Sequence, residues 1–249
     1  MGCSRSRSFV HVSGSLERFF TLLRTSSAEL YEDNRTVMAT SELLPTANAI
    51  DSGDVDLFWV GVEKGLIRLE RGGKFNTFDR PVPGGHWALL SRSKTGGWYN
   101  AEYLPQLASY VDAIVNAGYP KERVFFELPP KALQLDLAIV DDDSRVIILG
   151  EAKRERGMLP RLVRAVEERF AAAAPTEESK KRGDEARQLA WRLWTVHPPL
   201  CWLIGPGERV SYKCSYGPLR LSEPGPLPDA KRLGLDHRPP RPLTPPPLI

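Results

Sequence analysis

The sequence contains no long apolar segment. None of the apolar runs in its 249 residues approaches the length of about 18 residues that a transmembrane helix requires. The N-terminal stretch MGCSRSRSF also lacks the apolar core of a secretory signal. We therefore expect a protein that neither spans a membrane nor is secreted, and that works in the cytoplasm or in association with the nucleoid.

Cysteine and histidine are both scarce. The three cysteines, Cys3, Cys201 and Cys214, form no spaced cluster, and this odd, low count indicates reduced thiols rather than a disulfide framework. The four histidines are scattered and lack the spacing of zinc ligands. No phosphate-binding glycine loop and no nucleophile elbow is present either. These absences argue against a zinc site, nucleotide binding through a glycine loop, and serine-hydrolase chemistry.

The charges are almost balanced, with 34 Lys and Arg against 31 Asp and Glu and a formal net charge of +3. This mild basic excess suits a nucleic-acid partner but does not demand one. The start MGCSRS fits a short lipidation pattern at Gly2 and Cys3. We expect a flexible terminus there. The alternative is a lipid-anchored adaptor that presents its proline-rich C-terminal segment to a partner.

Composition divides the chain into three parts. Residues 1–90 read as a small mixed α/β lobe of unknown role, with a helix over 15–24 and strands that include VDLFWVGV at 55–62. Residues 91–220 hold the main domain. Residues 221–249 contain nine of the 22 prolines and are expected to be a disordered tail.

The main domain alternates between helical and strand patterns. A helix is predicted over 101–116, and it is followed by three strands. Two helices rich in Ala, Glu and Arg come next, and after them a buried strand at 199–206 with a hairpin partner at 209–214. This order predicts an α/β fold, with a central mixed sheet flanked by helices.

Charged residues stand out in the two strands of LQLDLAIVDDDSRVIILGEAKRE, residues 133–155. Side chains alternate across a strand, so Glu151 and Lys153 share one face. If residues 141–144 form the turn, Asp136 lies opposite Leu149 and on the same face as Glu151, within roughly 7–8 Å of it. We therefore expect Asp136, Glu151 and Lys153 to converge.

Two carboxylates held this close need a cation between them. Lysine alone could serve, and so could Mg²⁺, which prefers oxygen ligands and would find a further one in the backbone carbonyl of Ala152. Lys153 would then face a metal-bound water and assist its attack on a phosphodiester. The alternative is an ordinary hairpin whose charges lie at a solvated end. Asp136 argues against that, because a half-buried carboxylate needs a partner.

Asp136 in LQLDLAI and the triplet Glu151-Ala152-Lys153 in ILGEAKRE resemble the motif of the PD-(D/E)XK nuclease superfamily. The expected order of elements over residues 100–206, αβββαβ, is similar to the restriction-endonuclease-like core of that family. The resemblance covers under half of the chain, and Leu135 stands where the motif has proline. It implies a nuclease that uses Mg²⁺, with Mn²⁺ as a substitute, and that cleaves DNA rather than RNA.

Two further positions follow from the resemblance alone. Some family branches add a glutamate on the first helix that takes part in catalysis and metal binding. Glu102 matches this position, so the resemblance implies the same role for it. Others place a glutamine on a helix after the lysine strand, and Gln188 fits that role near the nucleic acid. The simpler readings are an anion at a helix N-terminus for Glu102 and a surface helix residue for Gln188.

Basic residues are frequent after the motif, from Arg154 and Arg156 to Arg192. Arg154 and Arg156 are nearest to the expected chemistry and are the best candidates for contacts with a phosphate backbone. A homodimer is one assembly that the sequence leaves open. The rival function is a non-catalytic module on the same fold that binds nucleic acid or protein.

Overall fold

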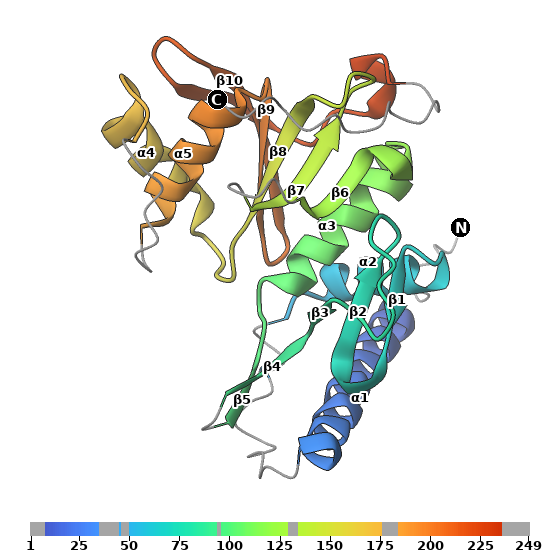
Figure 1. Ribbon diagram of the computed structural model, residues 1–249. Coiled ribbons are helices and arrows are strands. Elements are labelled where there is room, and N and C mark those ends of the chain that lie inside the picture. The colour runs from blue at the N-terminus through green and yellow to red at the C-terminus, as the bar shows by residue number, and fades with distance from the viewer. Residues whose placement is uncertain are drawn as a thin grey trace, which may run out of the picture. The chain divides into compact units, whose positions relative to one another are not determined.

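The computed structural model of the chain describes residues 8–34, 45, 50–93, 96–128, 134–175 and 184–235. The chain separates into two compact units, residues 1–111 and residues 112–249 (Figure 1). None of the helices in the described ranges is both long and apolar enough to cross a membrane.

The first unit combines helices with short antiparallel strands. Its elements are α1 (Ser8–Asn34), α2 (Ser52–Glu63), β1 (Ile67–Leu69), η2 (Arg71–Gly73), β2 (Lys74–Thr77), β3 (Trp87–Ala88), β4 (Leu90–Ser93), β5 (Gly96–Tyr99) and most of α3 (Tyr103–Val115). Strands β1, β2 and β3 form one antiparallel sheet, and β4 pairs with β5. Phe19 of α1 meets Phe58 of α2 edge to face, with ring centroids 5.2 Å apart, so the two helices share a core.

The strand predicted at residues 55–62 is wrong, because this segment lies within α2. Asp51 caps the helix by accepting hydrogen bonds from the backbone N–H groups of Gly53 and Asp54. Val55, Phe58 and Trp59 are buried at the spacing of one helical face. A short apolar run fits a buried helix as well as a buried strand, and here the N-cap and the packing favour the helix.

The helix predicted over 101–116 is confirmed as α3. The boundary between the two compact units falls inside this helix, after Val111, whereas the sequence analysis placed a boundary near residue 90.

The second unit is built on a six-stranded sheet with the order β11-β10-β9-β8-β7-β6. Its elements after α3 are η3 (Lys121–Arg123), β6 (Val124–Leu128), β7 (Leu135–Val140), β8 (Val146–Ala152), α4 (Leu159–Phe170), α5 (Glu185–Val196), β9 (Leu200–Gly205), β10 (Glu208–Ser215), β11 (Arg220–Gly225) and η4 (Ala230–Leu233). Strands β6, β7 and β8 form an antiparallel meander, and β9 pairs parallel to β8. The predicted mixed α/β fold with a central mixed sheet is confirmed, and the described ranges hold five α-helices in all.

Helices α4 and α5 provide the crossover that makes β9 parallel to β8. Both pack onto one face of the sheet, where Leu162 of α4 and Leu189 of α5 join Leu149 of β8 and Cys201 of β9 in one apolar cluster (Figure 1). Since side chains alternate along a strand, residues 151 and 153 project from the same face as Leu149. The helices therefore cover the face that carries the charged motif.

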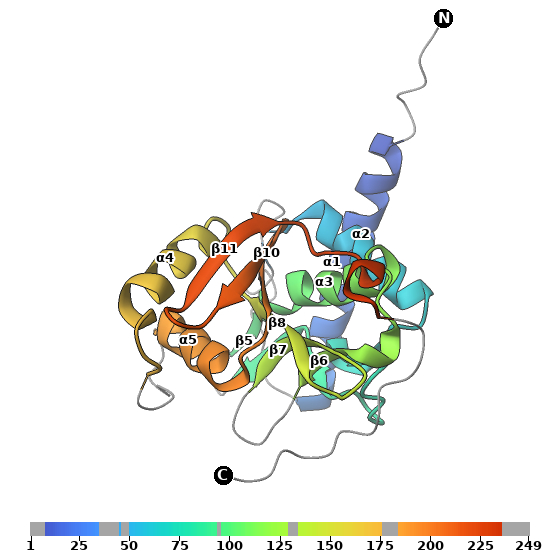
Figure 2. The same ribbon diagram turned by 90° about the horizontal axis from the view of Figure 1, so that it is seen from above.

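The predicted disordered tail begins too early. Residues 220–225 form β11, which pairs antiparallel with β10 along the edge of the sheet (Figure 2). Leu219 and Leu221 are buried and anchor this strand. Pro224 is tolerated because β11 is an edge strand, where a missing N–H faces no partner. Residues 236–249 of the predicted tail lie outside the described residues.

Candidate functional site

The hairpin of β7 and β8 places the first two acidic residues of the motif opposite each other. Leu137 pairs with Gly150 and Ala138 with Leu149, and continuing this register by one residue brings Asp136 across from Glu151. The predicted pairing of Asp136 with Leu149 is therefore wrong by two residues. The cause is a longer loop over 141–145 and an irregularity where Val140 meets Val146. A shift of two residues preserves the face, so the expected convergence holds.

A glycine lets the two strands approach closely at this point. A Cβ atom added to Gly150 would lie 2.6 Å from the Cβ of Leu137, which no ordinary packing permits. Gly150 directly precedes Glu151 and faces the side of the sheet opposite to it. The absence of a side chain thus supports the pairing that brings the carboxylates together.

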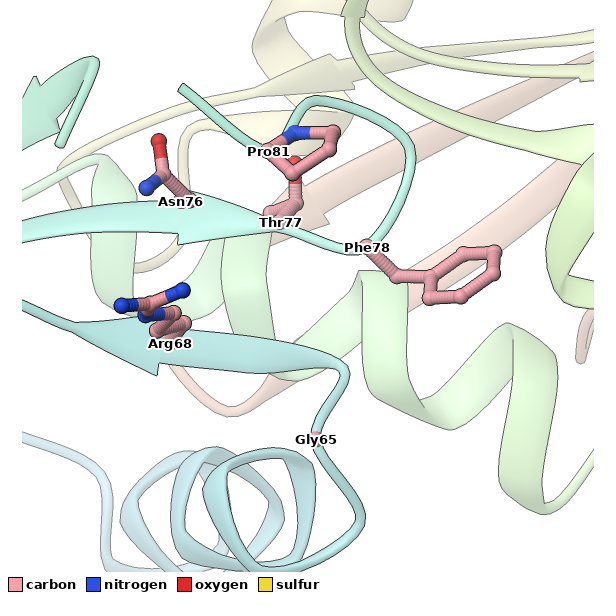
Figure 3. A pocket seen from close by; sticks show the side chains of 6 residues that line it. All are labelled: Gly65, Arg68, Asn76, Thr77, Phe78 and Pro81. Atoms are coloured by element: carbon pink, nitrogen blue, oxygen red, sulfur yellow. The ribbon is translucent and has the colours of Figure 1, made fainter. Parts of the chain in front are cut away.

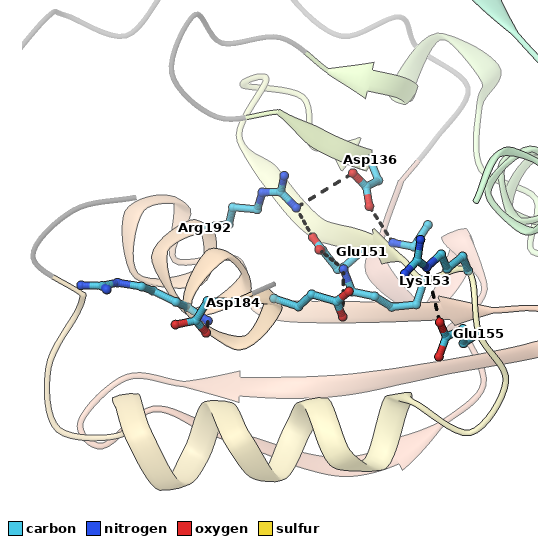
Figure 4. A network of polar contacts seen from close by, with 10 residues as sticks. Asp136, Glu151, Lys153, Glu155, Asp184 and Arg192 are labelled. Carbon is cyan, nitrogen blue, oxygen red and sulfur yellow. Dashed lines mark hydrogen bonds and ion pairs between the residues drawn. The ribbon is translucent and has the colours of Figure 1, made fainter. Parts of the chain in front are cut away.

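Four charged side chains meet at the ends of β7 and β8 (Figure 4). Lys153 Nζ lies 2.8 Å from Glu151 Oε1, and Arg192 of α5 donates a short hydrogen bond to Glu151 Oε2. The same Arg192 Nη1 lies 3.9 Å from Asp136 Oδ1. Asp136 Oδ2 accepts a hydrogen bond of 2.7 Å from the backbone N–H of Ala152. The cluster therefore pairs two acids with two bases.

These charges are largely withdrawn from solvent. The exposed fraction of the side chain is 1% for Glu151, 7% for Lys153, 9% for Arg192 and 19% for Asp136. Burial of single charges at this depth is strongly unfavourable, so each one depends on its partners. Asp136 is the most accessible member and marks the side of the cluster nearest to solvent.

The pKa values of the two acids are shifted in opposite directions. Burial raises the pKa of Asp136 well above its ordinary value, and the neighbouring Glu151 charge adds to this effect. Burial would also raise the pKa of Glu151, but Lys153 and Arg192 outweigh it and lower that pKa below its ordinary value. Burial alone would lower the pKa of Lys153, yet Glu151 raises it above its ordinary value. Glu151 is therefore the firmly ionised acid, and Lys153 keeps its proton.

Arg192 is a member of the site that the motif did not identify. The sequence pattern identified it only as one of the basic residues that follow the motif. Its neighbours Trp191, Leu193 and Trp194 in the sequence are apolar, and this is the signal that could have marked it as buried. The partner could not be read from the chain, because Glu151 lies 41 positions away.

The exposed side of the cluster is bordered by α5. Glu185 Oε2 lies 3.8 Å from Lys153 Nζ, and Arg192 contacts Glu151, so both ends of α5 reach the cluster. Residues three and four positions apart share a helical face, which places Gln188 on the same face between Glu185 and Arg192. This position agrees with the role expected for Gln188, although its contact with nucleic acid stays a prediction.

The positions of the other predicted site residues support their expected roles less directly. Arg154 and Arg156 follow β8 and are exposed, and Arg154 forms an ion pair of 3.4 Å with Glu155. Ala152 is buried within β8, and the ligand role of its carbonyl group stays a prediction. Glu102 immediately precedes α3 in the first unit. The cluster belongs to the second unit, so the role of Glu102 also stays a prediction.

The donor set can be tested against the chemistry of Mg²⁺. In the described parts of the chain, no three His, Cys, Asp or Glu side chains are grouped so as to hold a metal ion. Asp136 and Glu151 nevertheless direct one oxygen each towards the same cationic group of Arg192. Mg²⁺ is usually held by one or two carboxylates, with water and phosphate oxygens completing its shell. The pair therefore fits in donor type and charge, provided that Arg192 gives way.

A pocket in the first unit is a weaker candidate. It has a volume of about 210 Å³ (Figure 3) and is lined by Gly65, Arg68, Asn76, Thr77, Phe78 and Pro81. Its only charged lining residue, Arg68, is already paired with Glu70 at 3.0 Å. The pocket thus offers no pair of groups suited to acid–base or metal chemistry, and the charged cluster is the better candidate site.

Comparisons with protein-family models, with curated proteins and with solved structures give no match. The function is therefore inferred from the geometry of the cluster.

Proposed function

We propose that the second unit is a metal-dependent nuclease of the PD-(D/E)XK type, which hydrolyses phosphodiester bonds in nucleic acid, DNA in preference to RNA. The observation that carries this proposal is the convergence of Asp136 and Glu151 on one cationic position, with Lys153 beside it. The order α3, β6, β7, β8, α4 and α5, β9 also agrees with the αβββαβ core of a restriction-endonuclease-like fold.

Each residue of the cluster has a role in this proposal. Asp136 and Glu151, with the Ala152 carbonyl, would hold Mg²⁺ or Mn²⁺. When bound, the ion would polarise the phosphate and lower the pKa of a water molecule. Lys153 is protonated, so it acts as a hydrogen-bond donor that orients the attacking water and stabilises negative charge as it develops.

The substrate would approach from the solvent side of the cluster. Arg154 and Arg156 are exposed directly after β8, where they can contact phosphates on either side of the cleaved bond. Gln188 shares the α5 face that borders the cluster. Phosphate contacts of this kind carry little sequence information, so we expect cleavage with little sequence preference.

The test is a cleavage assay on linear, nicked, branched and single-stranded DNA and on RNA, each with Mg²⁺, with Mn²⁺ and with EDTA. Wild-type protein should cleave at least one DNA substrate only with a divalent ion. Lys153→Met keeps most of the length of the side chain but removes the donor, and it should abolish cleavage. Arg220→Gln, an exposed change on β11, is the control and should cleave like wild type. A wild-type protein inactive on every substrate would contradict the proposal.

A second candidate function is a non-catalytic binding module, and one observation favours it. Lys153 and Arg192 already neutralise the acidic pair, so the cluster is balanced as a structural element. This reading predicts nucleic-acid or protein binding with the same affinity with and without Mg²⁺. The nuclease reading predicts that Mg²⁺ binding is lost in Asp136→Ala.

A further inference from the structure

We propose that Arg192 is an internal competitor of the divalent cation: its guanidinium group holds the place between Asp136 and Glu151 and has to leave before a metal ion can bind. This inference rests on the proposed function, since it concerns the loading of the same site. It adds a regulated step, in which α5 determines how readily the site accepts its ion.

Arg192 and Lys153 differ in the carboxylate oxygens that they contact. Nη1 of Arg192 reaches both acids, with a short hydrogen bond to Glu151 Oε2 and a distance of 3.9 Å to Asp136 Oδ1 (Figure 4). Lys153 Nζ instead contacts the other oxygen of Glu151, Oε1, and lies 3.8 Å from Glu185. A cation shared by both carboxylates would take the place of Arg192 and leave the bond between Lys153 and Glu151 intact.

The two bases also differ in their attachment to the site. Lys153 follows β8 directly, and its backbone N–H donates to Ile204 O of β9 at 2.8 Å, so the sheet holds it in place. Arg192 lies on α5, and its own link to the carboxylates is its long side chain. A guanidinium group on such a side chain can move away from the carboxylates by rotation about its own bonds. Substrate phosphate is then a suitable new partner for it.

The consequence is that removal of Arg192 strengthens metal binding. A positive group next to a cation site repels the incoming ion, and it also occupies the carboxylate oxygens that the ion needs. Arg192→Gln should therefore raise the affinity for Mn²⁺ by at least about tenfold, which corresponds to about 1.4 kcal/mol. Arg192→Lys retains the charge and should bind Mn²⁺ as weakly as the wild type. Damage to the site would weaken binding, so only the loss of a competitor gives this direction.

The experiment measures binding of Mn²⁺ alone, without nucleic acid, by isothermal titration calorimetry and by the electron paramagnetic resonance signal of free Mn²⁺. The full-length chain is used as wild type, Arg192→Gln, Arg192→Lys and the control Arg220→Gln. Tighter binding in Arg192→Gln alone, abolished by adding Asp136→Asn, supports the proposal. Equal affinity of wild type and Arg192→Gln overturns it and leaves the proposed function standing. No Mn²⁺ binding in any variant overturns both.

A second measurement needs no substitution and so does not depend on how a variant folds. In the wild-type protein, the side-chain ¹⁵N resonances of Arg192 are followed by NMR during titration with Mg²⁺. The resonances should move from those of a carboxylate-bound, slowly rotating guanidinium group to those of a freely rotating one, at the same Mg²⁺ concentration that shifts the Asp136 carboxyl signal. Arg192 signals that stay unchanged while the Asp136 signal shifts would overturn the proposal.

Discussion

The two acids of the cluster should contribute unequally to the stability of the fold. Replacing Glu151 by Gln removes the anion that contacts both Lys153 and Arg192, and both bases remain almost fully buried. The glutamine amide can accept one hydrogen bond through its oxygen, but its NH₂ group then faces the other donor. Loss of one partner from a buried ion pair costs about 3–5 kcal/mol. We expect Glu151→Gln to reduce the free energy of unfolding by an amount in that range.

Asp136→Asn should be far milder, for reasons visible in the same contacts. Burial and the Glu151 charge raise the pKa of Asp136, which means that its ionised form is less favourable in the folded protein than in the unfolded chain. A neutral asparagine removes that repulsion and can still accept the hydrogen bond from the Ala152 N–H group. It loses the attraction of Arg192 Nη1, 3.9 Å from Asp136 Oδ1, and the weaker attraction of Lys153. We expect a change below about 1 kcal/mol, in either direction.

Thiol exposure in urea measures this difference within the second unit. Cys201 of β9 is buried in the folded sheet and Cys214 of β10 is half-buried, and a Cys3→Ser background removes the third thiol. With a urea slope of about 1.5–2 kcal/mol/M, Glu151→Gln should lower the midpoint of thiol labelling by roughly 2 M. Asp136→Asn should move it by less than about 0.5 M. Equal shifts for both variants, or a larger shift for Asp136→Asn, would refute the assigned contacts.

Three further outcomes are expected. At pH 8 without urea, Cys201 and Cys214 should stay unreactive towards a disulfide reagent. The reason is that burial raises the pKa of both thiols, that of Cys214 to about 12. Labelling within seconds would contradict this prediction. Gly150→Ala should cost about 1–3 kcal/mol in the urea assay, because its Cβ would lie 2.6 Å from that of Leu137. Gly225→Ala, with nothing within 4 Å of the added Cβ, is the matched control, and equal midpoints would be the contrary result. EDTA should abolish cleavage yet shift the midpoint of thermal unfolding by less than about 2 °C, because Lys153 and Arg192 already balance the acidic pair. A large drop of the midpoint on chelation would show that folding needs the metal.

Local sequence patterns predicted a large part of the fold and of the site. The alternation of side chains along strands placed Asp136, Glu151 and Lys153 on one face, and an error of two residues in the register did not change that face. The helix over 101–116 and strands β6 to β10 of the second unit followed from apolar spacing in the same way. These features depend on residues close in the sequence, so the sequence by itself determined them.

Other features depended on contacts between distant segments. The helical state of residues 52–63 and the strand at 220–225 arose from packing partners that a short window does not contain. Arg192 reaches Glu151 only because the crossover lays α5 on the charged face of the sheet. The sequence thus determined which acids and which lysine meet, while the tertiary structure decided which cation stands between them. The physical reason is that strand alternation is a local property, whereas the neutralisation of buried charge depends on whatever the whole fold brings within reach.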